Sequence, residues 1–266
     1  MKTSGRAALL LASVLSFAGC ARTPAPTAPN AKQLYLDLLK LGLTDLLYET
    51  DPKVRAMRVD GADWPGRAVT MVGIKRLDNL QVAIEDVIAR GVPGDLLEAG
   101  AWRGGACIFM RGVLKANGVT DRRVWVADSF EGLPTPDPGK YPADAEAGPE
   151  AAGLMAVPLE AVTANFARFA LLDEQVLFLK GWFRDTLPKA PIEKLSVLRL
   201  DGDLYESTMD SLVNLYPKLS SGGYLIVDDY GSTPASAKAV TDYRAKHGID
   251  DPIVKIDWTG IYWRKK

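Results

Sequence analysis

Histidine and cysteine are scarce in this chain of 266 residues, which has one histidine and two cysteines. The single histidine, His247, excludes a metal site built from several imidazoles, and two cysteines cannot form a disulfide framework or a cysteine-rich zinc site. Cys107 lies in the apolar run 106–110 and is predicted to be a buried thiol. The sequence therefore excludes histidine-rich and cysteine-rich metal centres.

The chain also lacks an excess of charge of either sign. Its 32 basic and 33 acidic side chains give a net charge of −1. A nucleic-acid-binding protein normally shows a basic excess or a basic stripe, so no nucleic-acid partner is expected. With 47% hydrophobic and 24% charged residues, the composition is that of a globular protein, and the length suits one large α/β domain with appendages.

Residues 1–30 differ from the rest of the chain. Two basic residues precede the apolar run 7–18, which ends in small residues before Cys20. This pattern is typical of an export signal and is too short to span a membrane as a mature helix. It resembles a bacterial lipoprotein signal with Cys20 as the lipidated residue, followed by a proline-rich linker at 21–30. Two expectations stay open: a lipoprotein tethered to a membrane at Cys20, or a cytoplasmic protein whose extension is not processed.

Short apolar runs alternate with helical patterns from residue 91 onward. Predicted strands cover residues 95–99, 124–127, 175–179, 196–200 and 224–227, and predicted helices cover 105–116, 159–171, 186–189, 208–219 and 235–246. Two further runs, 253–256 and 260–264, flank a turn and predict an antiparallel hairpin. Together they predict an α/β fold with a Rossmann-like, mostly parallel sheet of seven strands, as in class I methyltransferases.

Residues 31–90 precede this domain, which spans 91–266, and form a predicted helical lid region. A leucine-rich amphipathic helix is predicted at 33–48 and another helix at 76–90. The first helix is interpreted as a lid or as a homodimer contact, with simple packing on the domain as the alternative. The segment between these two helices is predicted to be a loop.

The first predicted strand runs into the glycine-rich sequence Glu98-Ala-Gly100-Ala-Trp102-Arg103-Gly104-Gly. Ligands of open α/β sheets bind at the carboxyl ends of the strands, and glycine lets the backbone approach them closely. An acid at this position can accept a hydrogen bond from the ammonium group of an amino-acid-bearing cofactor. Glu98, Gly100, Trp102, Arg103 and Gly104 are therefore predicted to bind the cofactor, with a glycine-rich turn required only for packing as the alternative.

The second predicted strand ends in Asp128-Ser129. An acid at the end of this strand is placed to accept hydrogen bonds from two ribose hydroxyls. Methyltransferases and dehydrogenases share this feature, so it predicts a ligand that contains adenosine, without choosing the reaction. A helix cap is the alternative interpretation of Asp128.

The fourth and fifth predicted strands each end in carboxylates. Asp201 and Asp203 follow one strand, and Asp228 and Asp229 follow the other. Neighbouring strands lie about 5 Å apart, so the four carboxylates would repel one another unless a cation lay between them. Oxygen ligands suit Mg²⁺, Ca²⁺ or Mn²⁺. We predict Asp201, Asp228 and Asp229 as metal ligands, with helix capping as the alternative.

In combination, these motifs resemble those of the macrocin O-methyltransferase family, over nearly the whole chain from about residue 33. The resemblance implies S-adenosylmethionine as cofactor, with Asp201 also beside it, and Mg²⁺ held by Asp201, Asp228 and Asp229. It implies Asp203 as a candidate general base. A histidine near the C-terminal helix is proposed as base in some relatives, and His247 is the matching candidate here, although it could simply cap that helix.

The expected reaction is metal-assisted methylation of a hydroxyl on a sugar-containing or polyol small molecule, as in natural-product or glycan tailoring. The loops at 51–70 and 133–158 are expected to choose the acceptor. Two other hypotheses stay open. An NAD(P)-dependent oxidoreductase would share Asp128 but would require the Gly-x-Gly-x-x-Gly pattern of dinucleotide-binding proteins, which differs from the pattern at residues 100–105. A non-catalytic lipoprotein that retains the fold would fit the export signal.

Overall fold

The computed structural model describes residues 30–266 of the chain. The predicted export signal, its cleavage site and Cys20 lie outside these residues. Within the described part, no helix combines the length and the apolar character needed to cross a lipid bilayer.

Seven strands form one sheet, in the order β3-β2-β1-β4-β5-β7-β6. The first five along the chain pair in parallel, and the last two pair antiparallel, which confirms the predicted class. The strands are β1 (Asp95–Ala99), β2 (Val124–Asp128), β3 (Val176–Lys180), β4 (Leu195–Leu200), β5 (Leu219–Val227), β6 (Val254–Lys255) and β7 (Ile261–Arg264). β5 begins earlier than predicted, because its first half contains Gly222 and Gly223 and reads as a loop in sequence.

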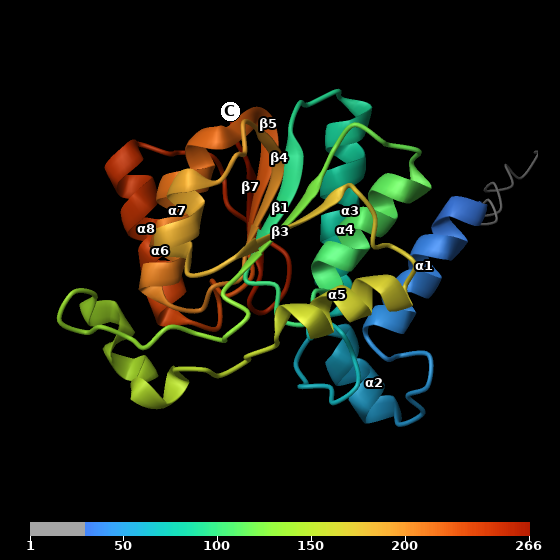
Figure 1. Cartoon of the computed structure of the whole chain (residues 1–266), viewed down its shortest axis with the longest axis horizontal. Helices are drawn as coiled ribbons and strands as arrows, with labels where there is room; N and C mark the ends of the chain where they lie inside the picture. Colours follow the sequence, from blue (N-terminus) through green and yellow to red (C-terminus); the bar gives the residue numbers. More distant parts are fainter. Residues whose placement is uncertain (1–29) are drawn as a thin grey trace, which may run out of the picture.

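Helices cover both faces of the sheet (Figure 1). One face packs against α1 (Ala31–Leu43), α3 (Ile74–Ala89), α4 (Gly105–Ala116) and α5 (Leu159–Arg168). The other packs against α6 (Phe183–Thr186), α7 (Tyr205–Leu215) and α8 (Pro234–His247). Successive strand residues point to opposite faces, so Leu96 belongs to the first core and Leu97 to the second. This double burial explains the continuous apolar strands.

The region before the sheet departs from the prediction in one place. Residues 52–59, predicted as loop, form helix α2 (Pro52–Val59). Asp51 caps it by accepting a hydrogen bond from the Lys53 amide (2.8 Å), and Pro52 occupies the first turn. The helix buries no hydrophobic side chain, so the sequence carries no apolar periodicity that would reveal it.

Helix α1 shares the core with the sheet. Leu36 and Leu43 are fully buried in that core, whereas Leu34 and Leu38 on the same helix are more than half exposed. The helix therefore packs on the domain, and a homodimer contact through its exposed residues stays a prediction.

The long segment 133–158 is more structured than the predicted loop. It contains two short 3-10 helices, η1 (Pro142–Ala147) and η2 (Pro149–Ala151). Asp144 is 1% exposed and accepts hydrogen bonds from the backbone amides of Tyr205 (2.6 Å) and Glu206 (3.1 Å). These amides begin α7, which has no side-chain cap of its own. The insertion therefore supplies the cap and is anchored by it.

Replacement of Asp144 by alanine should remove this cap. We expect Asp144→Ala to lower the free energy of unfolding by about 1–2 kcal/mol, the usual range for loss of an N-cap, as measured by urea denaturation. Asp137→Ala is the control, since the exposed Asp137 carboxylate contacts only the amides of Gly139 and Lys140 in its own turn. Equal urea midpoints for the two variants would contradict the anchoring role.

Candidate active site

The register of the sheet gathers the predicted motifs at one edge. Ala99 at the end of β1 pairs with Ala127 of β2 and with Leu200 of β4, and Leu200 pairs with Val227 of β5. The residues that follow these four positions therefore share the carboxyl end of the sheet, where α/β folds bind their ligands. A cavity of about 250 Å³ opens there. Of the predicted site residues it is lined by Glu98, Gly100, Trp102, Asp128, Ser129, Asp201, Asp203, Asp228 and Asp229.

The glycine-rich turn places only some of its residues in the cavity. Gly100 has φ 95°, and a Cβ there would overlap the carbonyl of Asp201, so this glycine lets β1 and β4 end side by side. Trp102 lines the cavity with φ 48°, a left-handed conformation that is unusual for a bulky residue.

Arg103 and Gly104 lie outside the cavity lining. The Arg103 guanidinium stacks on Trp102 and donates hydrogen bonds to the carbonyls of Pro65, Gly66 and Ala68. A Cβ at Gly104 would come within 2.8 Å of Val162. Both residues thus stabilise the turn on its side away from the cavity. Direct contact with a cofactor stays a prediction for them.

Asp128 joins the turns after β1 and β2. One carboxylate oxygen accepts the amides of Ala101 (2.7 Å) and Trp102 (3.2 Å), and the other accepts the amide of Phe130 (2.8 Å). Burial raises the pKa of Asp128, and these amide hydrogen bonds oppose the shift. Ser129 donates to the Gly132 carbonyl at 2.7 Å. A carboxylate has about four lone-pair positions, and three amides already donate to Asp128. About one position is therefore left for a donor from a ligand.

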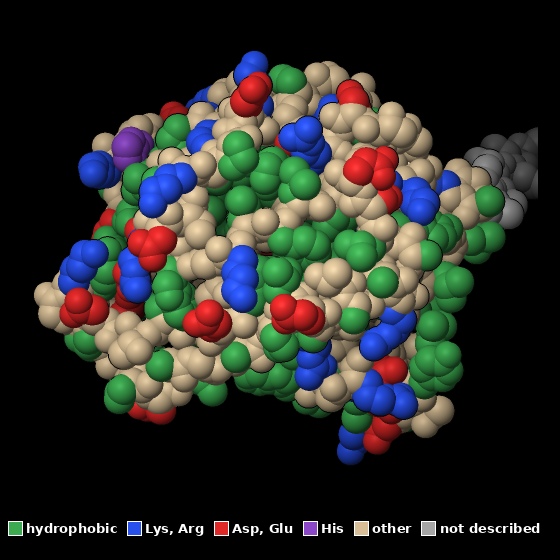
Figure 2. Space-filling model, viewed as in Figure 1, with side chains coloured by type: hydrophobic (Ala, Val, Ile, Leu, Met, Phe, Trp, Pro, Cys, Tyr) green, Lys and Arg blue, Asp and Glu red, His purple; other side chains and the backbone are tan. Residues whose placement is uncertain are grey.

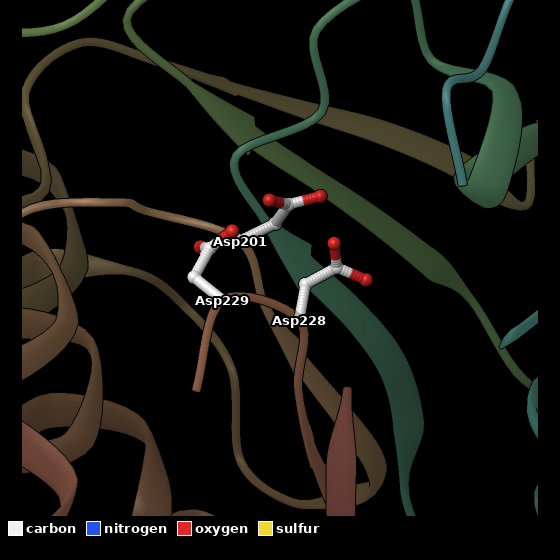
Figure 3. A group of neighbouring side chains, drawn as sticks. All are labelled: Asp201, Asp228 and Asp229. Carbon is white, nitrogen blue, oxygen red and sulfur yellow. The ribbon is translucent and has the colours of Figure 1, made fainter. Parts of the chain in front are cut away.

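The strands β4 and β5 bring the predicted metal ligands together. Asp201, Asp228 and Asp229 each offer a carboxylate oxygen, and these oxygens lie within 4.8 Å of one another. Figure 3 shows the three side chains side by side at the two strand ends. Asp203 adjoins them, because its backbone amide donates to Asp229 at 3.1 Å. Asp203 has φ 55°, so this turn also holds a non-glycine residue in the left-handed region.

The two candidate bases lie in different places. Asp203 lines the cavity, whereas His247 is the last residue of α8 and is exposed, with its ring stacked on Tyr243. Helix α8 begins close to the cavity at Pro234, and a helix of 14 residues is about 20 Å long. The structure thus places Asp203, and not His247, beside Asp201, Asp228 and Asp229. These four carboxylates are here called the acidic cluster.

Comparison with known proteins assigns this site to a family. The profile of the macrocin O-methyltransferase family (TylF) matches residues 25–265. The chain is 56% identical over 245 residues to 8-demethyl-8-(2,3-dimethoxy-alpha-L-rhamnosyl)-tetracenomycin-C 4'-O-methyltransferase of Streptomyces olivaceus, covering 88% of this chain and 94% of that protein. It is 51% identical over 260 residues to demethyldecarbamoylnovobiocin O-methyltransferase of Streptomyces niveus, covering 91% and 99%. This chain belongs to the macrocin O-methyltransferase family.

The solved structures agree with this assignment. The structure of the O-methyltransferase NovP superposes with a TM-score of 0.85 at 52% identity, covering 88% of this chain and 99% of that one. A calicheamicin methyltransferase shares the fold at 20% identity with a TM-score of 0.57. The chain is therefore an O-methyltransferase with a class I fold, and the oxidoreductase and non-catalytic hypotheses are set aside.

In this macrocin O-methyltransferase family member, two buried arginines balance part of the acidic cluster. Arg199 on β4 is 1% exposed and pairs with Glu98, with Asp228 and, at 2.8 Å, with Asp201. Arg76 on α3 pairs with the other carboxylate oxygen of Asp228. The sequence analysis missed both. For Arg199 a signal was available, because it is a charged residue within the apolar strand Leu195–Leu200. A strand covered on both faces buries its charged side chains, and a buried charge needs a partner.

Glu98 lines the cavity and also takes part in a buried ion pair. Its carboxylate is 2% exposed, pairs with Arg199 and accepts a hydrogen bond from the Cys107 thiol at 2.8 Å. Burial raises the pKa of Glu98 to about 7, and the Arg199 charge opposes this rise. Cys107 is buried as predicted, and burial raises the pKa of its thiol well above the ordinary range. Glu98 thus supports the turn through Arg199, and its contact with a cofactor stays a prediction.

The rest of the acidic cluster is short of positive charge. Neither Asp203 nor Asp229 forms an ion pair with a residue in the range 30–266. Burial first, and the neighbouring carboxylates second, raise the pKa of Asp203 to about 7 and that of Asp201 to about 6, and they raise the pKa of Asp229 well above its usual range. Crowded carboxylates with so few counter-charges fit a divalent cation.

Loss of Arg199 should be severe. Arg199→Met would leave Glu98, Asp201 and Asp228 without their shared guanidinium, and removing one partner of a buried ion pair costs about 3–5 kcal/mol. Urea denaturation should show a loss of about that size. Arg123→Met, at an exposed position just before β2, should change the urea midpoint little. A midpoint for Arg199→Met close to that of this control would contradict the central role of Arg199.

The metal-free protein should lose stability as pH rises. Glu98, Asp201 and Asp203 have folded-state pKa values of about 7, 6 and 7, above the unfolded value of about 4. The folded state therefore keeps these protons at a pH where the unfolded state has released them, and this contribution is lost as pH rises from about 4 to about 7. Thermal unfolding in EDTA should show a decreasing Tm between pH 5 and pH 8. Added Mg²⁺ should reduce the decrease, and a Tm that rises with pH in EDTA would contradict the expectation.

Proposed function

We propose that this enzyme transfers the methyl group of S-adenosylmethionine to a sugar hydroxyl of a natural product, with Mg²⁺ at Asp201, Asp228 and Asp229. The observation that carries the proposal is the shared cavity, in which the glycine-rich turn after β1 and the acidic cluster after β4 and β5 face the same space. A methyl donor and an activated hydroxyl must meet within about 3–3.5 Å, so the two sites have to be adjacent.

The relatives support a sugar as the acceptor. The relatives from Streptomyces olivaceus and Streptomyces niveus are named for a rhamnosyl-tetracenomycin and for a novobiocin precursor. A third, 51% identical over 247 residues, is the mycinamicin III 3''-O-methyltransferase of Micromonospora griseorubida, covering 88% of this chain and 96% of that protein. These names share a glycosylated small molecule and differ in the aglycone. We therefore infer a sugar hydroxyl and leave the aglycone to experiment.

The residues that line the cavity suggest how each part works. When bound, a divalent cation would lower the pKa of a coordinated hydroxyl by several units. We infer that Asp203 accepts the hydroxyl proton at its carboxylate, because it adjoins Asp229 and lines the cavity. S-adenosylmethionine would supply the methyl group from its sulfonium.

Charge over the rest of the molecule agrees with a small-molecule acceptor. Figure 2 shows basic and acidic side chains intermingled over one face, without a stripe of one sign on that face. The cavity instead offers aromatic side chains, Trp64, Trp182 and Trp258, whose apolar rings suit the faces of a sugar or an aromatic aglycone.

The function is tested by methyl transfer from labelled S-adenosylmethionine to three acceptors, which are the demethylated rhamnosyl-tetracenomycin, demethyldecarbamoylnovobiocin and mycinamicin III. We expect product from at least one acceptor in Mg²⁺, none in EDTA, and recovery on adding Mg²⁺ back. Asp201→Asn should abolish metal-dependent turnover, while calorimetry should still detect S-adenosylhomocysteine binding. Full activity in EDTA would rule out the metal, and binding of neither cofactor nor acceptor would rule out the function.

The general base is tested by a matched pair of variants. Asp203→Asn should lower kcat by about 10²–10⁴-fold, the usual worth of a general base, with S-adenosylhomocysteine affinity retained. His247→Gln should keep kcat close to that of the parent enzyme, because the His247 ring lies outside the cavity lining. A large loss of kcat in His247→Gln, with Asp203→Asn still active, would reverse the assignment.

A further inference from the structure

Arg76, near the start of α3, contacts three parts of the chain that are distant in sequence. Its guanidinium pairs with Asp228, its Nη2 donates to the carbonyl of Gly61 at 3.1 Å, and its Nε lies 3.0 Å from Oδ2 of Asp257 in the turn between β6 and β7. The side chain is only 6% exposed. One buried guanidinium thus links a predicted metal ligand to the segment at Gly61.

The segment 60–66, here called the cover segment, borders the cavity. Its residues Gly61 and Trp64 line the cavity, as does Arg76 itself. The Trp258 indole donates to the carbonyl of Asp60 at 2.9 Å, and Trp258 also lines the cavity. The cover segment contributes no strand or helix of its own. The amides of Asp60, Gly61 and Ala62 donate to carbonyls of α2, and side chains such as Arg76 and Trp258 hold the carbonyls of Gly61 and Asp60.

The packing around Arg76 leaves little freedom. Gly61 has φ 62°, and a Cβ at this position would overlap the Arg76 guanidinium. On the other side, a Cβ at Gly260 would come within 3.1 Å of the Arg76 Cδ. The guanidinium therefore fills a slot between the cover segment and the turn after β6, where it pairs with Asp228, donates to the Gly61 carbonyl and lies against the Asp257 carboxylate without a hydrogen bond from its Nε.

We propose that Arg76 is a positioning residue that orients the Asp228 carboxylate and ties the cover segment to it, so that the metal site and the wall beside it are held as one unit. This inference rests on the proposed function, because it takes Asp228 as a metal ligand. A purely structural ion pair would stabilise the fold without making the order of the cover segment depend on Arg76.

Arg76→Lys is the main variant, because lysine keeps the charge but cannot reach three partners with one ammonium group. We expect the variant to fold and to bind S-adenosylhomocysteine within about twofold of the parent enzyme. We expect it to bind Mn²⁺ about tenfold more weakly by electron paramagnetic resonance, the size of effect that loss of one charge-assisted hydrogen bond produces. Amide exchange in residues 60–66 should be faster, and the acceptor KM should rise more than kcat falls.

Gly61→Ala tests the same link from the other side. An added methyl group at this left-handed position should displace the guanidinium without changing any charge, so Mn²⁺ affinity should fall as in Arg76→Lys. The same methyl group would also come within 2.7 Å of the Gly73 amide nitrogen, so faster exchange in this variant does not by itself report on Arg76. Lys75→Gln is the matched control. Lys75 neighbours Arg76 on α3 and pairs with Asp60 at 2.6 Å, but this exposed pair does not involve Asp228.

Three results would separate the hypotheses. Parent-like Mn²⁺ affinity and parent-like exchange of residues 60–66 in Arg76→Lys would overturn the inference, as would an equal effect in Lys75→Gln. If Arg76→Lys failed to fold, the Mn²⁺ affinity of Gly61→Ala would decide. If the parent enzyme bound no Mn²⁺, the proposed metal function would fail and the inference with it, even if the exchange rates still showed that Arg76 orders the cover segment.

Discussion

The structure depends on the arrangement of like charges around two buried guanidinium groups. Five of the carboxylates that line the cavity at the end of the sheet are those of Glu98, Asp201, Asp203, Asp228 and Asp229. Arg199 and Arg76 neutralise part of this charge. A cluster with this excess of negative charge is expensive to bury, and a protein that only needed stability would be better served by apolar residues. The remaining charge supports the proposed divalent cation.

Arg199 also joins the two halves of the site. It bridges Glu98 of the first strand to Asp201 and Asp228, which follow the fourth and fifth strands. Glu98 in turn accepts a hydrogen bond from the Cys107 thiol of α4. The turn predicted to hold the methyl donor and the cluster predicted to hold the metal are therefore parts of one ionic network. A change in one half would be transmitted to the other through a single fully buried side chain.

The parts of this site that sequence could predict are those set by strand order. Asp201 and Asp228 follow adjacent parallel strands, and because such strands end at the same edge, their meeting follows from the apolar pattern alone. Arg76 could not be found this way, since it reaches Asp228 across 152 positions of the chain from a helix whose pattern shows only one apolar face. Helix α2 could not be found because its sequence lacks apolar periodicity. Chain order does place His247, because α8 begins soon after Asp229 and His247 ends this helix, about 20 Å further on.

The helix cap provided by Asp144 bears on which acceptor the cavity can take, because it anchors a segment of the cavity wall. Residues 133–158 contribute Leu133, Pro134, Leu154 and Met155 to the cavity wall. The insertion contacts the start of α7 through the Asp144 carboxylate and through the Tyr141 ring, which packs on Tyr205. The two amides that Asp144 binds belong to the first turn of α7, which begins two residues after Asp203. An enzyme built in this way can exchange the side chains of residues 133–158 while it leaves the sheet, the glycine-rich turn and Asp203 unchanged. Under this hypothesis, relatives that methylate chemically different glycosides share the sheet and the residues at its carboxyl end, and they differ mainly in the segment that corresponds to residues 133–158.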